Sequence, residues 1–326
     1  MFNVPFYPEA IPIVFAANKK YVPYMSAMIQ SVMENASQNR KYVFYILHKE
    51  ITCETIALLK TQISFFPQFS IEFIDVTTYI SKYNLFISRH ITVEAYFRLL
   101  IPELLCEYQK AIYLDSDMIC CTDIAELFDI NLENYLIAAV RGIRAIYAIK
   151  EMGGVGVNFK NINEYFNSGV CVFNIDLFGK TISSEKIFEI ASSREWNFHD
   201  QDVLNCIAEG KTLLLPYSWN YISTAYKKYF SEALQNEYDK AEKDPKIIHY
   251  KPWDCGNYIL HFELFWKYAT RTPFIDDIME RMKVNKFTTE SFKETVISYI
   301  KQRKDIGIRF ILFDCVRAWL FRDKRK

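Results

Sequence analysis

The chain of 326 residues carries no net charge, because 39 Lys and Arg residues balance 39 Asp and Glu residues. Proteins that bind nucleic acid through its phosphates usually carry an excess of basic residues, so the balance gives no reason to expect a nucleic-acid partner. No apolar run approaches the roughly 20 residues of a membrane-spanning helix. Residues 1–10 lack the basic and apolar regions of a signal peptide. We therefore expect a cytoplasmic protein, which leaves contact with a membrane surface open.

The eight cysteines lack the spacing of a zinc site. Cys120 and Cys121 are adjacent, and no Cys-x-x-Cys pair or Cys/His cluster occurs. This pattern indicates small apolar side chains in a reducing compartment. Hydrophobic residues make up 51% of the chain, which argues against disorder because ample apolar surface is available to offset the entropy lost on folding.

Short apolar runs alternate with amphipathic stretches through the first half of the chain. This alternation predicts strands at residues 11–17, 42–47, 71–76 and 111–114, and helices at residues 21–34, 52–63 and 92–105. Strands that alternate with helices imply an α/β fold with a mainly parallel sheet covered on both faces. Ligands bind such sheets beyond the carboxyl ends of the strands, near a switch in strand order.

The second half of the chain is less regular. We predict further strands at residues 138–140, 170–173, 213–215 and 247–250, and helices at residues 177–191 and 202–209. From His261 onward the pattern becomes helical and increasingly basic. The sequence therefore predicts a catalytic domain at residues 1–260 and a helical C-terminal region at residues 261–326.

Two carboxylates follow the fourth predicted strand directly, in the motif Asp115-Ser116-Asp117. At a strand end, where the chain turns, both carboxylates can converge on one cation. Oxygen ligands suit Mg²⁺ or Mn²⁺, which commonly bridge a protein carboxylate and substrate phosphates. The alternative is a solvated turn, since acidic residues are common at strand ends.

A histidine, His249, ends another apolar run and is followed by Lys251 and Pro252. Neutral imidazole can complete the ligand set of Mn²⁺. Taken alone, a histidine after a strand is more often a hydrogen-bonded structural residue.

With these motifs the sequence resembles the retaining glycosyltransferases of family 8, which include bacterial lipopolysaccharide galactosyl- and glucosyltransferases and glycogenin. The resemblance runs from about residue 11 to residue 253. Six motifs carry it in the family's order: Ile-Val-Phe-Ala-Ala at residues 13–17, Tyr-Phe-Arg-Leu-Leu at 96–100, Tyr-Leu-Asp-Ser-Asp at 113–117, Phe-Asn-Ser-Gly-Val at 166–170, His-Asp-Gln-Asp-Val-Leu-Asn at 199–205 and His-Tyr-Lys-Pro-Trp at 249–253.

The resemblance implies a GT-A-type nucleotide-binding fold and a bound Mn²⁺, with Mg²⁺ as the alternative. Asp115, Asp117 and His249 would ligate this ion, and oxygens of UDP would fill its remaining positions. Residues at the end of the first strand would border uracil and ribose, namely Ala16, Ala17, Asn18 and Tyr21. The remaining donor-binding residues would be His90, Arg98, Ser116, Asn167 and Lys251. Asp200 and Gln201 would lie at the transferred sugar as the catalytic pair.

Several of these residues have a plain structural alternative. Tyr21 could be an ordinary aromatic residue at a helix start, Arg98 on a helix would usually face solvent, and Asn167 could be a turn former. The chain also departs from the family's pattern at three places. It has Asn-Lys-Lys at residues 18–20, where an acidic residue is usual. The loop from His249 to Lys251 is shortened, and Arg141 stands where many members carry an acidic sugar-binding residue.

These features predict an enzyme that transfers glucose or galactose from a UDP-sugar to a glycan, such as lipopolysaccharide or another lipid-linked acceptor. Family resemblance implies retention of anomeric configuration, and a front-face route needs no protein nucleophile. Aromatic and basic residues occur together at residues 309–326; they suit either a helix on anionic lipid or an ordinary helix with a basic tail. Two other functions remain open. One is a nucleotidyltransferase, although no glycine-rich loop follows the first strand, and the other is a catalytically silent nucleotide- or glycan-binding module.

Overall fold

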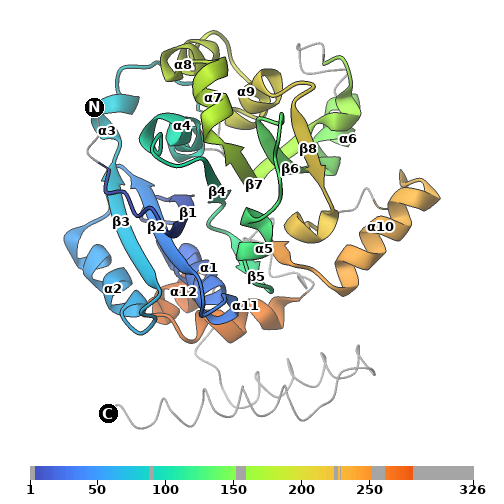
Figure 1. The fold of residues 1–326 in the computed structure, drawn as a ribbon. Coiled ribbons are helices and arrows are strands. Elements are labelled where there is room, and N and C mark those ends of the chain that lie inside the picture. The colour runs from blue at the N-terminus through green and yellow to red at the C-terminus, as the bar shows by residue number, and fades with distance from the viewer. Residues whose placement is uncertain are drawn as a thin grey trace.

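The computed structural model describes residues 4–87, 92–151, 159–223, 227, 229–250 and 261–281. Its centre is a seven-stranded sheet in the order β3-β2-β1-β4-β7-β6-β8 (Figure 1). The strands are β1 (Ala10–Ala16), β2 (Lys41–His48), β3 (Phe69–Asp75), β4 (Lys110–Leu114), β6 (Ile137–Arg141), β7 (Phe166–Asn174) and β8 (Thr212–Leu215). A small second sheet pairs β5 (Met118–Cys120) with β9 (Ile247–His249).

The predicted mainly parallel sheet is confirmed. Strands β1 to β4 run parallel, as do β6 and β8, whereas β7 is antiparallel to both of its neighbours. Almost every residue of β1 and β2 is buried. Because both faces of these central strands are covered, their sequences are continuous apolar runs rather than alternating ones. The strand order turns at β1 and β4, so the carboxyl ends of these two strands are where a ligand is expected.

Two apolar cores lie on opposite faces of the sheet, and helices cover both faces (Figure 1). One face is covered by α1 (Val22–Asn35), α2 (Cys53–Ile63), α5 (Ala125–Phe128), η3 (Tyr217–Asn220), α10 (Glu232–Lys243), α11 (Phe262–Ala269) and α12 (Ile275–Arg281). The other is covered by α3 (Thr77–Ile80), η1 (Val93–Leu100), α4 (Ile101–Leu104), α7 (Ile175–Thr181), α8 (Ser184–Ser192) and α9 (Asp200–Ile207). The remaining helices are α6 (Ile143–Glu151) and η2 (Ile162–Glu164).

Two predicted helices are wrong in detail. The helix expected at residues 92–105 is the 3₁₀ helix η1 followed by one α-helical turn, α4, which carries Pro102 in its first turn. Proline lacks an N–H group and is tolerated there, where no helical partner is needed. The helix expected at residues 177–191 is split into α7 and α8. The Ser183 side chain accepts a hydrogen bond from Lys186 N and so starts a new helix.

Helix α1 connects the sheet to the described part of the C-terminal region. It is buried along most of its length, and the Asn35 amide donates hydrogen bonds to Cys120 O and to the Tyr268 hydroxyl of α11. The expected division at residue 260 stays a prediction, and the basic and aromatic segment at residues 309–326 lies outside the described residues.

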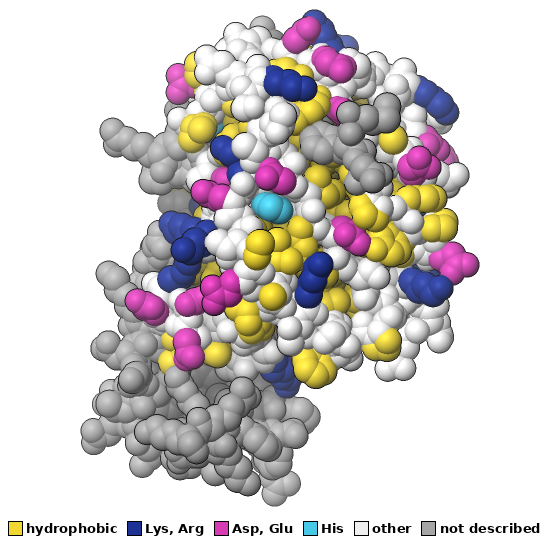
Figure 2. All heavy atoms as spheres, turned by 90° about the vertical axis from the view of Figure 1, so that its left-hand side faces the viewer, with side chains coloured by type: hydrophobic (Ala, Val, Ile, Leu, Met, Phe, Trp, Pro, Cys, Tyr) yellow, Lys and Arg dark blue, Asp and Glu magenta, His cyan; other side chains and the backbone are white. Residues whose placement is uncertain are grey.

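Within the described ranges, every helix is too short or too polar to cross a bilayer. On the face shown in Figure 2, basic and acidic side chains are interspersed between apolar ones. This arrangement agrees with the zero net charge of the chain.

Candidate active site

The two aspartates of the Asp-Ser-Asp motif lie between the end of β4 and the start of β5. Asp115 N donates to Gly169 O on the neighbouring strand β7, at 2.8 Å, and Tyr250 N donates to Asp117 O at 2.9 Å. The β5–β9 pairing sets Met118 opposite His249. The antiparallel pairing therefore carries the histidine to the two aspartates, which are more than 130 residues earlier in the chain.

Asp115, Asp117 and His249 form a cluster whose ligand atoms all lie within 4.8 Å of one another. The Nε2 atom of His249 lies 3.1 Å from Asp117 Oδ1 and 3.7 Å from Asp115 Oδ2. A Cβ atom on Gly169 would stand 2.7 Å from His249 Cε1 and 2.8 Å from Asp115 Oδ2. The space beside the cluster therefore exists only because residue 169 is glycine.

The donor set fits a hard divalent cation. Carboxylate oxygens suit Mg²⁺ and Mn²⁺, and one imidazole shifts the preference toward Mn²⁺. The tautomer of His249 fits as well. Its Nδ1 lies 2.9 Å from Asn220 Oδ1, an atom that can only accept, so Nδ1 carries the proton and Nε2 presents its lone pair to the aspartates.

A chain of directed hydrogen bonds fixes this tautomer. The Asn220 amide group donates to Asn167 Oδ1 at 2.8 Å, and the Asn167 amide group donates to Gln201 Oε1 at 2.9 Å. Each amide thus has its oxygen turned toward the preceding donor. Asn167 and Gln201 therefore fix the direction in which the Asn220 oxygen points, and this oxygen fixes the proton on Nδ1 of His249.

The same chain ends at a buried carboxylate. The Gln201 amide group donates to the Tyr165 hydroxyl at 3.0 Å, and this hydroxyl donates to Asp202 Oδ1 at 2.7 Å. Burial raises the pKa of Asp202, while the bonds from Tyr165 and from Phe198 N act in the opposite sense. A carboxylate at this end can only accept, so it sets the direction of every bond back to His249.

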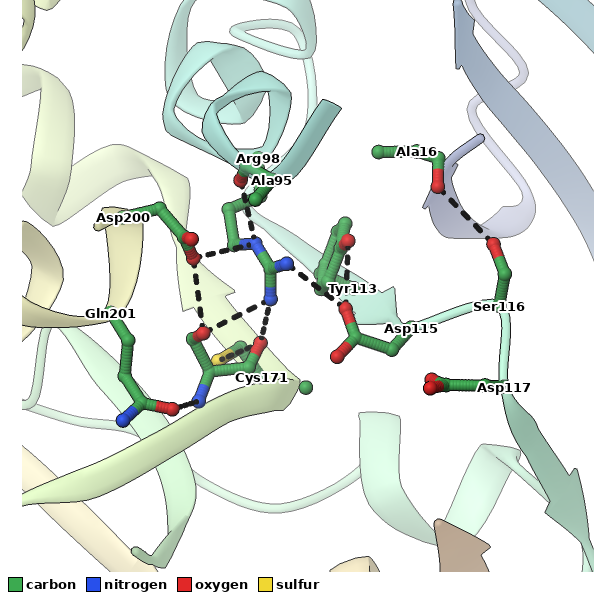
Figure 3. Close-up of polar contacts among 12 residues, drawn as sticks. Ala16, Ala95, Arg98, Tyr113, Asp115, Ser116, Asp117, Cys171, Asp200 and Gln201 are labelled. Carbon is green, nitrogen blue, oxygen red and sulfur yellow. Dashed lines mark hydrogen bonds and ion pairs between the residues drawn. The ribbon is translucent and has the colours of Figure 1, made fainter. Parts of the chain in front are cut away.

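Arg98 joins Asp115 of this cluster to Asp200 (Figure 3). It is buried, and its guanidinium lies 3.0 Å from Asp115 Oδ1 and 2.9 Å from Asp200 Oδ2. It also donates to Ser168 O and Oγ and lies over the Tyr113 ring, 4.2 Å from its centroid. Burial disfavours the charged form, but the attraction of the two aspartates is larger in sum, and the pKa of Arg98 is raised.

The catalytic pair predicted from the sequence starts helix α9. His199, the residue before it, has a positive φ of 51°, which is strained for a residue other than glycine. Asp200 Oδ2 accepts from Ser168 Oγ at 3.0 Å as well as from Arg98, and Gln201 Oε1 accepts from both Asn167 and Ser168 N. The oxygen of Gln201 is therefore saturated by two donors in this arrangement.

The residues expected to border the nucleotide cluster at the carboxyl end of β1. Ser116 Oγ donates to Ala16 O at 3.2 Å, which links β1 to the aspartate motif. Asn18 Oδ1 accepts from Lys20 N and Tyr21 N, and its amide group donates to Glu94. Ala17 is buried beside them. His90 and Lys251 lie outside the described residues.

Several site residues were not singled out from the sequence. Asn220 orients His249, Tyr113 donates to Asp115 Oδ1 at 3.0 Å, and Glu94 accepts from Asn18. Gly169 was part of a motif, but its role became clear only from the contacts that a Cβ would make. Tyr113 had the strongest signal, since it stands two residues before Asp115 and an extended strand places such residues on one face.

Comparison with known proteins shows the family and the fold of the chain. The sequence profile of Glycosyl transferase family 8 matches residues 12–257. General stress protein A of Bacillus subtilis is 28% identical over 291 residues, which cover 86% of this chain and 96% of that protein. A lipopolysaccharide 1,2-glucosyltransferase of Escherichia coli is 28% identical over 261 residues, covering 77% and 75%.

Among solved structures, the galactosyltransferase LgtC in complex with donor and acceptor sugar analogs superposes with a TM-score of 0.67 at 21% identity. The match covers 81% of this chain and 96% of LgtC. At this identity the likeness shows the fold, which is of the GT-A type.

Replacing Gly169 by Ala is expected to abolish detectable Mn²⁺ binding, because the new methyl group would occupy the space between His249 and Asp115. Isothermal titration calorimetry measures this directly. The matched control is Gly179→Ala in α7, where nothing lies within 4 Å of the added Cβ, and it should bind Mn²⁺ like the wild type. Equal Mn²⁺ affinity in both variants would contradict the proposed position of the ion.

Proposed function

The chain belongs to glycosyl transferase family 8, and we propose that it transfers a hexose, glucose or galactose, from a UDP-sugar to a glycan acceptor with the help of a divalent metal ion. The observation that carries the proposal is the position of the cluster of Asp115, Asp117 and His249 beside Asn167 and Gln201. The lipopolysaccharide glucosyltransferase relative supports a lipopolysaccharide or another lipid-linked glycan as the acceptor.

The metal ligands would hold Mn²⁺, with Mg²⁺ as the alternative. When bound, the ion supplies Lewis-acid stabilisation of the negative charge that develops on the departing diphosphate. Asp115 presents Oδ2 to this position, because Arg98 and the Tyr113 hydroxyl occupy its Oδ1 atom. Arg98 would thus orient Asp115, a ligand of the ion. That Arg98 also contacts the donor stays a prediction.

The sugar would lie against the Asn167 and Gln201 side chains. Gln201 Oε1 accepts two hydrogen bonds, so attack by this atom on the sugar carbon would require both to break. Asp200 is held by Arg98 and Ser168. These contacts favour a front-face reaction, in which the leaving phosphate helps to deprotonate the acceptor and neither side chain forms a bond to the sugar.

From the sequence alone we also propose that the protein is cytoplasmic and that residues 309–326 contact anionic lipid. Aromatic and basic residues in this segment suit a lipid surface. Such contact would bring the enzyme to a lipid-linked acceptor.

The first test is release of UDP from UDP-glucose and UDP-galactose by the purified protein, with Mn²⁺ and with a chelator. We expect slow, Mn²⁺-dependent release from one donor. Asp117→Asn should lower this rate by about 100-fold or more. Mutation of a residue that only hydrogen-bonds to a metal ligand typically costs about 10- to 100-fold in metal affinity or activity, and Asp117 would be a ligand itself. The control is Asp129→Asn on the surface, where the carboxylate is 56% exposed and pairs only with Arg40 among the described residues.

The outcome also tests the alternative of a catalytically silent module. Binding of UDP and Mn²⁺, seen as thermal stabilisation, without release from any donor would favour the catalytically silent module. If the protein neither binds UDP with Mn²⁺ nor releases UDP from any donor, the proposed donor is contradicted.

Gln201→Ala tests the route. We expect kcat to fall by only about 10- to 100-fold, because a positioning group and two hydrogen bonds are lost but no nucleophile. Loss of a nucleophile in other enzymes costs about 10⁶-fold in kcat. Single-turnover rates with the preferred donor measure the change, and Gln109→Ala on the exposed surface is the control. A fall of about 10⁵-fold or more would point to a covalent intermediate on Gln201.

A further inference from the structure

The predicted catalytic pair, Asp200 and Gln201, stands in a tight turn formed by residues 198–201. Gln201 N donates to Phe198 O at 3.0 Å, which closes the turn. His199, the second residue of the turn, has φ 51° and ψ −121°. These angles are close to those of the first central position of a type II′ turn, about +60° and −120°, where glycine is the usual residue.

The backbone of His199 is strained in this conformation. A Cβ atom disfavours it, whereas glycine adopts it readily. A strained residue persists only where the surrounding structure enforces its conformation, and such residues cluster at functional sites. Histidine at a position that suits glycine, directly before the predicted catalytic pair, indicates that its side chain contributes something that glycine would not.

The His199 side chain joins the turn to the helix that carries Arg98. Residue 199 is only 2% exposed. Its ring lies edge-on to the ring of Tyr96 on η1, with 5.9 Å between the centroids. Two residues further along η1, Arg98 binds Asp200, the residue after His199. The imidazole and the ion pair therefore hold consecutive residues of the turn against the same short helix.

The first residue of the turn is held by a different part of the structure. Phe198 N donates to Asp202 Oδ2 at 2.8 Å, and the Phe198 ring lies edge-on to Tyr165, with 6.5 Å between the centroids. Tyr165 in turn donates to Asp202 and accepts from Gln201. His199 is thus the link between a fixed residue before it and the two predicted catalytic side chains after it.

We propose that His199 is a positioning residue, whose imidazole packs on Tyr96, holds the type II′ turn and so sets the directions of Asp200 and Gln201. The inference rests on the proposed function, because these two side chains are the ones that would face the transferred sugar. His199 acts through them and does not itself contact the substrate. Glycine would permit the same turn but would leave it free to adopt others.

The strain is tested by comparing glycine with alanine at residue 199. His199→Gly and His199→Ala both remove the ring, but only glycine removes the strain. We expect the glycine variant to have a Tm roughly 2 °C or more above that of the alanine variant. The matched control is Ser193, an exposed residue with φ −72°, where alanine should be at least as stable as glycine. A lower or equal Tm for His199→Gly would overturn the strained turn.

The positioning role is tested by separating kcat from binding, with the UDP-sugar that the wild type accepts. Both variants should lose about 10- to 100-fold in kcat, because a misplacement of about 1 Å can cost about 100-fold. The Kd for UDP in the presence of Mn²⁺ should stay within about twofold, since the proposed metal ligands lie on other elements. A side chain that only stabilises the fold would leave kcat unchanged below the Tm, and that result would contradict the proposal.

Hydrogen exchange reports on the turn without turnover. The Gln201 N–H group closes the turn, so its exchange should become about 10-fold faster or more in both variants, relative to amides of the central strand β2, and should not change in Ser193→Ala. Unchanged exchange at Gln201 would refute the role of the imidazole. If no UDP-sugar releases UDP even with the wild type, the proposed function fails instead, and the exchange rates still decide whether His199 holds the turn.

Discussion

The buried ion pairs of Arg98 hold the two halves of the site together. One half is the aspartate motif at the end of β4, and the other is the start of α9. A single guanidinium on η1 binds a carboxylate from each, Asp115 and Asp200. Two carboxylates so close would repel one another in a buried site, and loss of one member of such a network costs about 3–5 kcal/mol. The position of Asp115 relative to Asp200 therefore depends on this one cation.

A second constraint is the direction of the hydrogen-bond chain from Asp202 to His249. Three side-chain amides lie along it, and each is oriented by its neighbour. The chain joins a residue of α9 to His249 on β9 through β7 and η3. It gives a physical reason why polar groups are retained in a buried site: together with Gly169, they give the imidazole one tautomer and one position.

The sequence was sufficient to predict much of this arrangement. Continuous apolar runs located the central strands, and the carboxylates after residue 114 pointed to the edge of the sheet where Asp115, Asp117 and His249 cluster. Asn220 could not be found in this way, because its role depends on a contact with His249 that is 29 residues away. The break between α7 and α8 depends on one cap, Ser183, within an amphipathic stretch. The short helix η1 resembled an α-helix because its apolar positions fit both periodicities, and only packing against the sheet decides between them.

The central claim is that one divalent ion binds between Asp115, Asp117 and His249 and holds the donor's diphosphate. Anomalous diffraction from crystals grown with Mn²⁺ and UDP, recorded near the manganese absorption edge, tests it most directly. The account predicts a single strong anomalous peak within coordination distance of Asp115 Oδ2, Asp117 Oδ1 and His249 Nε2, with the diphosphate on its open side. Clear density for UDP without a peak at these three atoms, or with the peak elsewhere, would contradict it.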